Sequence, residues 1–188
     1  ALLLASCGPQ SLTLPDDPVD RAATCGVVAA AGARAATHIK RVLPFTPQLK
    51  ILHHALLAGS EGESFADEAS TADIERMPAL QEEITEGKWQ ELAPTCRDAF
   101  PTAKKEEVTL PGDRFEAQLG CDALADFLTG KLRSQEMNYG NQLADYRELL
   151  RKLDGTLGPG LRRRAGADLT SQQDARRQAL ADAAKLGS

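Results

Sequence analysis

Apolar side chains return at helical spacing along most of this chain. The clearest run contains Leu143, Tyr146, Leu150, Leu153 and Leu157, which are separated by three or four residues. This spacing places side chains on one face of an α-helix. Alanine occurs 30 times, whereas valine and isoleucine together occur 9 times and aromatic residues 8 times. Alanine favours helices, and sheets pack best with β-branched and aromatic residues. The sequence therefore predicts an all-α protein of six to seven helices.

Proline, glycine and capping residues predict where the first helices begin and end. We expect a helix over residues 18–43 that Pro44 terminates, followed by a helix that Thr46 caps. Small residues in the first helix would let another backbone approach it closely. Ser70 or Thr71 is expected to cap the third helix.

Prolines and glycines inside the later apolar stripes predict interruptions. Pro78 and Pro94 each predict a kink or a break in a helix. The cluster of glycines and proline over residues 155–160 is expected to end the helix that contains the clearest run. Asp168 or Thr170 should cap the last helix. Because that helix has few large apolar side chains, we expect it to be the most weakly held.

A polar break divides the chain into two helical halves. Residues 101–112 contain two lysines, two glutamates and then a Pro-Gly pair, which is the widest interruption of the helical pattern. We therefore predict a first helical unit over residues 19–101, a linker over 102–112 and a second helical unit over 113–188.

The two units share a faint similarity that suggests a duplication. Cys25 and Cys121 each follow an Asp-Arg pair near the start of a long helix, and they lie 96 positions apart. Further matches in the same order have offsets of 94 and 100 positions. Similar offsets indicate related units, and chance matching between alanine-rich helices is the alternative. A counterpart of residues 89–100 would lie beyond Ser188, so the second unit would be either shorter or truncated.

The first residues carry a short motif, Leu4-Ala5-Ser6-Cys7. An aliphatic residue, two small residues and a cysteine resemble the lipobox of bacterial envelope lipoproteins. In that family the small residues fit the signal peptidase, and the thiol receives diacylglycerol before cleavage. The resemblance implies that residues 1–6 are the remnant of a signal peptide, that Cys7 carries the lipid, and that residues 7–18 form a tether. An ordinary apolar helix start that contains a cysteine is the alternative reading.

The resemblance also implies a location. Gly8 follows the lipid-bearing cysteine where an inner-membrane retention signal would have aspartate. We therefore expect the protein on the periplasmic side of the cell envelope, anchored to the outer membrane. Two or three acyl chains would anchor it stably, since one alone is marginal. No stretch approaches the roughly 18 apolar residues of a transmembrane helix.

The remaining cysteines predict one disulfide in an oxidising periplasm. With Cys7 used for lipid, Cys25, Cys96 and Cys121 remain, and one of the three must stay unpaired. We predict a bond between Cys25 and Cys96, because a three-helix unit can bring the start of its opening helix to its closing helix. Cys121 then stays free. A bond between Cys96 and Cys121 across the linker is the rival pairing.

No motif predicts catalysis, a metal site or a cofactor. His53 and His54 are adjacent, so on a helix they point about 100° apart, and zinc needs three or four converging ligands. We expect His53 to border the core and His54 to be more exposed. No base can be placed beside Cys121 to activate its thiol. We therefore predict no catalytic residue, no bound metal and no cofactor.

Charge excludes one class of partner. The net charge is -5, and no broad basic surface is predicted, so we expect no nucleic-acid partner. Arg162, Arg163 and Arg164 form the one basic cluster. They could contact an anion such as a lipid phosphate or an acidic partner. A solvated helix end is the simpler interpretation.

Together these features predict a membrane-anchored envelope lipoprotein. We expect it to be non-enzymatic and to act through contacts with an unknown protein partner. The alternative is a small periplasmic enzyme or ligand carrier with its site between the two helical halves. A cytosolic helical protein with a chance lipobox is the third option. A deep apolar pocket between the halves would favour the carrier, and a filled core would favour the first hypothesis.

Overall fold

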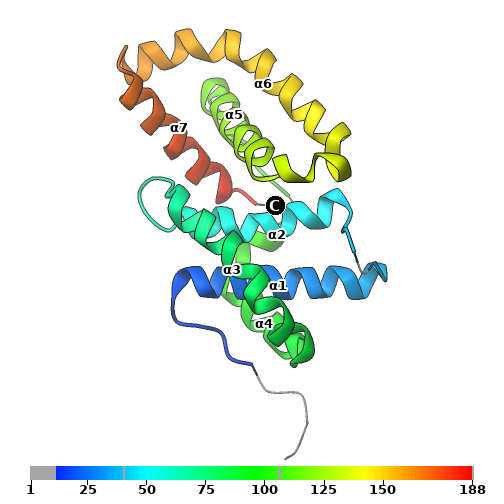
Figure 1. Cartoon of the computed structure of the whole chain (residues 1–188). Helices are drawn as coiled ribbons and strands as arrows, with labels where there is room; N and C mark the ends of the chain where they lie inside the picture. The colour runs from blue at the N-terminus through cyan, green and yellow to red at the C-terminus, as the bar shows by residue number, and fades with distance from the viewer. Residues whose placement is uncertain (1–11, 40, 106, 188) are drawn as a thin grey trace, which may run out of the picture.

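The computed structural model describes residues 12–39, 41–105 and 107–187, and it is all-α over these ranges, as predicted (Figure 1). The helices are α1 (Pro18–Thr37), α2 (Phe45–Gly59), α3 (Asp67–Glu86), α4 (Trp89–Ala99), α5 (Arg114–Lys131), α6 (Glu136–Ala165) and α7 (Leu169–Ala184). Short 3-10 helices, η1 (Pro101–Lys104) and η2 (Arg133–Gln135), precede α5 and α6. The lipobox, with Cys7, lies outside the described residues. None of the described helices is both long and apolar enough to cross a bilayer.

Helix α1 is the centre of the first helical unit and packs against α2, α3 and α4. Gly26 lies at the contact with α3, because a Cβ atom there would overlap the thioether end of Met77. The small residues of α1 therefore permit the close approach that the sequence predicts. Cys25 in α1 and Cys96 in α4 are joined by a disulfide with an S–S distance of 2.08 Å. The predicted pairing is confirmed.

Helix α5 holds the central place in the second unit. Helices α6 and α7 pack against it and form an arch around it in Figure 1. Asp122 of α5 is buried and forms an ion pair with Arg176 of α7. Gly160 faces the ring of Phe115, and a Cβ atom there would overlap this ring. Helix α6 continues through residues 155–160 to Ala165. The expectation that the glycines and proline of this segment end the helix is therefore wrong. Gly160 instead makes room for the packing of α5.

One apolar core joins the two units. It contains residues from α2 (Leu52, Leu56), from the following loop (Phe65), from α5 and its end (Ala123, Phe127, Leu128, Leu132), from α6 (Tyr139, Leu143) and from α7 (Leu180, Ala181, Ala184). The α7 members are at most 8% exposed. The end of α7 is therefore packed into this core, and the expectation that α7 is the most weakly held helix stays a prediction. Its alanines allow a close approach that larger side chains would block.

Polar contacts also connect the units. The Tyr139 hydroxyl donates to the Leu43 carbonyl at 2.7 Å. The Lys131 ammonium lies 3.1 Å from the Asp67 carboxylate and donates to the Thr71 hydroxyl at 2.7 Å. The second unit is thus tied to α3 and to the loop before α2. A duplication of the two units stays a prediction.

Several helix boundaries differ from those predicted. Helix α1 ends at Thr37 rather than near residue 43, because His38 adopts a left-handed conformation with φ 56°. Helix α2 begins at Phe45, and no side chain caps it, so the expected cap at Thr46 is absent. Helix α3 begins at Asp67, before the predicted caps. No side-chain hydrogen bond caps α2 or α3, so the expected caps do not set these boundaries.

The internal prolines do not break their helices. Helix α3 runs through Pro78 and α4 runs through Pro94, so neither proline breaks its helix, and a kink at either position stays a prediction. Both prolines are exposed, so water can hydrate the carbonyl group that each one leaves without a partner. At the start of α7, the Asp168 carboxylate accepts a hydrogen bond from the Ser171 amide at 2.8 Å. The predicted cap at Asp168 is confirmed.

Candidate functional site

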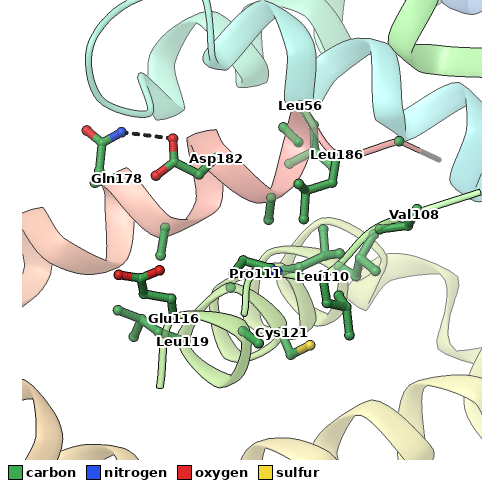
Figure 2. A pocket seen from close by; sticks show the side chains of 18 of the residues that line it. Leu56, Val108, Leu110, Pro111, Glu116, Leu119, Cys121, Gln178, Asp182 and Leu186 are labelled. Carbon is green, nitrogen blue, oxygen red and sulfur yellow. Dashed lines mark hydrogen bonds between the residues drawn. The ribbon is translucent and has the colours of Figure 1, made fainter. Parts of the chain in front are cut away.

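A cavity of about 620 Å³ lies between the two helical units (Figure 2). Its walls come from α2, the linker, α5, the end of α6 and α7. This volume lies in the range of pockets that bind small molecules, roughly 300–1,000 Å³. The space between the halves is therefore not filled by the core.

The cavity walls are predominantly apolar. Leu49 and Leu56 contribute from α2, and Leu119 and Leu124 contribute from α5. Figure 2 shows that linker residues reach the same space, with Leu110 and Pro111 below Leu56 and Leu186. An apolar molecule placed there would lose its contact with water on several sides.

The linker side chains remain partly open to solvent. Val108 is 43% exposed and Leu110 is 59% exposed, yet both line the cavity. The segment therefore covers one side of the cavity without closing it.

The polar groups at the cavity are mostly paired with one another. Arg164 lies 2.7 Å from the Asp113 carboxylate and 3.7 Å from the Glu116 carboxylate, and its guanidinium stacks 4.6 Å from the centre of the Phe115 ring. The Gln178 amide donates to the Asp182 carboxylate at 3.1 Å, as Figure 2 shows. Few charges are left to attract a strongly charged ligand.

His53 is the buried polar group on the α2 wall. Its Nε2 lies 2.7 Å from the Ala184 carbonyl, which can only accept, so Nε2 carries the proton. Burial lowers the pKa of His53, against a smaller upward effect of this hydrogen bond, so the ring is neutral at neutral pH. The bond ties α2 to the end of α7. His53 borders the core, as expected.

His54 is buried as well, although we expected it to be clearly more exposed than His53. Only 6% of its surface is accessible, and its ring meets the Phe100 ring edge to face at 5.2 Å. Burial, and to a lesser extent the neighbouring His53, lowers the pKa of His54 to about 4. Helix α2 packs against α1 and α3 of its own unit and against α7 of the second unit, so more than one of its faces is covered. Among the described residues, no group of three or more potential metal ligands is assembled.

Cys121 is free, as predicted. Its side chain is exposed and lies on the cavity wall (Figure 2). The thiol stands on α5 next to Gly120. This neighbour faces Ala183 of α7, whose Cβ lies 3.7 Å from where a Gly120 Cβ would be. The free thiol therefore offers a chemical handle on the cavity.

The predicted arginine cluster is divided by the structure. Arg164 is held by two carboxylates at the start of α5, so its charge is already compensated. Arg162 and Arg163 are exposed, and neither forms an ion pair with another described residue. An anion contact at Arg162 and Arg163 stays a prediction.

Sequence reasoning did not locate the cavity residues on α7. Ala175, Ala179 and Ala183 repeat every four residues and line the cavity together. From the sequence, the small side chains of α7 indicated a weakly packed helix. In the structure these alanines form one wall of the cavity, where their small size leaves space for it. The linker residues gave no periodic signal at all. No protein-family model, curated protein or solved structure matches this chain.

Proposed function

We propose that this protein is an envelope lipoprotein that binds an apolar ligand between its two helical units. The observation that carries the proposal is the cavity of about 620 Å³ with apolar walls from both units. The ligand class is an uncharged or weakly polar molecule with an aliphatic chain, such as a monoacylglycerol. Paired polar groups at Arg164 and Asp182 disfavour a highly charged ligand.

Membrane anchoring fits this proposal. Leu4-Ala5-Ser6-Cys7 would place a lipid on Cys7 and hold the protein beside a reservoir of lipids. The outer membrane is the proposed site, because Gly8 follows the cysteine. Expression of the complete gene in a bacterium that lipidates proteins should give a membrane-bound product that sediments with the outer membrane. The Cys7→Ala variant should lose processing at that site, and a soluble product with an intact, unmodified N-terminus contradicts the anchor.

A protein partner is the second candidate occupant of this surface. Val108 and Leu110 are exposed apolar side chains at the cavity edge, where a partner could pack. A partner would cover the linker from outside, whereas a ligand would enter the cavity. A small probe that binds in the cavity and is displaced by lipid would favour a ligand, because a partner packed on the outside of the linker does not require such binding.

The direct test uses the chain with Cys7→Ser, so that no lipid attaches. N-phenyl-1-naphthylamine, an uncharged apolar fluorophore, should bind saturably at one site and be displaced by monopalmitoylglycerol. Ala183→Phe places a ring in the cavity and should abolish binding, while Ala144→Phe, at an exposed position of α6, should leave it unchanged. Equal binding by both variants, or no saturable binding, refutes the proposal.

Cys121 provides an independent reading of occupancy. In the Cys7→Ser chain it is the only cysteine outside the disulfide, since the chain contains four cysteines. N-ethylmaleimide should alkylate it rapidly in the free protein and more slowly with monopalmitoylglycerol bound. Alkylation at the same rate in both states would place the ligand elsewhere.

A further inference from the structure

A second cavity, of about 440 Å³, lies within the first helical unit. Helices α1, α2 and α4 and the start of the linker supply its lining residues. The disulfide between Cys25 and Cys96 and the ring of Phe100 form part of the wall. The volume again falls in the range of small-molecule sites.

The charges at this cavity are all positive among the described lining residues. Lys50, Arg97 and Lys104 line it, and no aspartate or glutamate does so within the described ranges. Arg97 and Lys104 are exposed, and neither forms an ion pair or hydrogen bond with a described residue. In a chain of net charge -5, this local reversal of sign favours an anion.

The body of the cavity is aromatic and apolar. Trp89 lines it, and its ring packs on α1, where the Cζ3 atom lies 3.6 Å from the position of a Gly32 Cβ. Phe100 meets His54 edge to face in the same wall. Flat apolar molecules stack on such rings.

His54 adds a polar group without a partner. It is 6% exposed, it lines the cavity, and its Nδ1 is buried without a hydrogen-bond partner among the described residues. Unpaired polar atoms in a protein interior are costly and call for an explanation. A bound ligand beside the ring can supply the missing contact.

We infer that this cavity is a binding site for an aromatic carboxylate. The flat body would lie against Trp89 and Phe100, and the carboxylate would be held by Arg97 and Lys104. A guanidinium fork matches the two oxygens of a carboxylate, and an ammonium adds a second charge. Lys50 lines both cavities, so a Lys50 variant cannot separate this site from the apolar one.

Trp89 makes the site directly observable, because it is the only tryptophan in the chain and it lines this cavity. A ¹⁵N–¹H spectrum therefore contains a single indole signal. The probe is 2-naphthoate, and its uncharged analogue 2-naphthamide is the matched control. The indole signal should shift saturably with 2-naphthoate, and 2-naphthamide should bind about tenfold more weakly, since a charged hydrogen bond contributes roughly this much.

Two double variants test the cationic side of the site. Arg97→Gln with Lys104→Gln should weaken 2-naphthoate binding about tenfold and leave 2-naphthamide unchanged. Arg133→Gln with Lys152→Gln removes the same charge from exposed positions outside both cavities and should have no effect. Equal affinity for the acid and the amide overturns the inference, as does equal weakening by the two double variants. The same holds if the indole signal does not move.

Discussion

Asp73 gives the sharpest test of how this core is built. The side chain lies on α3, is fully buried, and neither carboxyl oxygen has a hydrogen-bond partner among the described residues. Burial raises the pKa of Asp73 from 3.8 to about 7. The folded protein therefore holds a proton at pH values where the unfolded chain has released it.

The sign of the pH dependence follows from this difference. Between pH 3.8 and about 7 the unfolded state binds fewer protons than the folded state, so the free energy of unfolding falls as the pH rises. At 1.36 kcal/mol for each pKa unit, the loss amounts to about 4 kcal/mol and is complete above pH 7. A neutral isostere avoids this loss. We therefore expect Asp73→Asn to become more stable than the natural protein as the pH rises, by up to about 4 kcal/mol at pH 8.

Urea unfolding followed by circular dichroism, with the disulfide intact, measures this difference at pH 4.5, 6 and 8. His54 has the opposite effect, because its lowered pKa removes stability as the pH falls from 6.5 to about 4. This contribution is present in both proteins and cancels in the difference between them. Glu75→Gln, at an exposed position of the same helix, is the control and should show no such trend. A difference that is the same at pH 4.5 and pH 8 refutes the buried, ionisable state of Asp73.

Three further changes test other parts of the fold. Cys25→Ser with Cys96→Ser should lower the free energy of unfolding by up to about 4 kcal/mol in urea titrations, because the bond closes a loop with a sequence separation of 71; unchanged stability contradicts this role. Gly160→Ala should cost about 1–3 kcal/mol through overlap with the Phe115 ring. Gly155→Ala, where an added Cβ meets nothing within 4 Å, should cost nothing, and an equal cost at both positions would show that the α5–α6 contact is misplaced. Leu180→Ala should cost about 2–5 kcal/mol and more than Leu150→Ala, and the reverse order would remove α7 from the core.

The spacing of apolar residues and the number of cysteines predicted the buried helix faces and the disulfide of this protein. Most of the stripe around Leu143 and of the stripe around Leu92 is buried, with Tyr146, Leu150 and Trp89 partly buried. The Cys25–Cys96 bond follows from joining the ends of one helical unit. These features depend on neighbours within a helix or a unit, which a periodic pattern records.

The features that sequence reasoning missed depend on contacts between distant segments. His54 was expected to be clearly more exposed than His53, yet it is buried, because helices of both units pack around α2. The alanines of α7 were taken as weak packing, although Ala181 and Ala184 are almost fully buried. Neither cavity has a sequence signature. Each is a space that the side chains of several distant helices leave unfilled, and no local pattern records this.

The position of α2 decides how the molecule folds. This helix precedes the linker, yet its Leu52 and Leu56 form one cluster with α5, α6 and α7. Neither half can bury this surface alone. We therefore expect the two halves to unfold together, although residues 102–112 separate them in the sequence. A single cut in the linker would leave two complementary fragments, and each of them alone would expose the apolar surface that they share through α2.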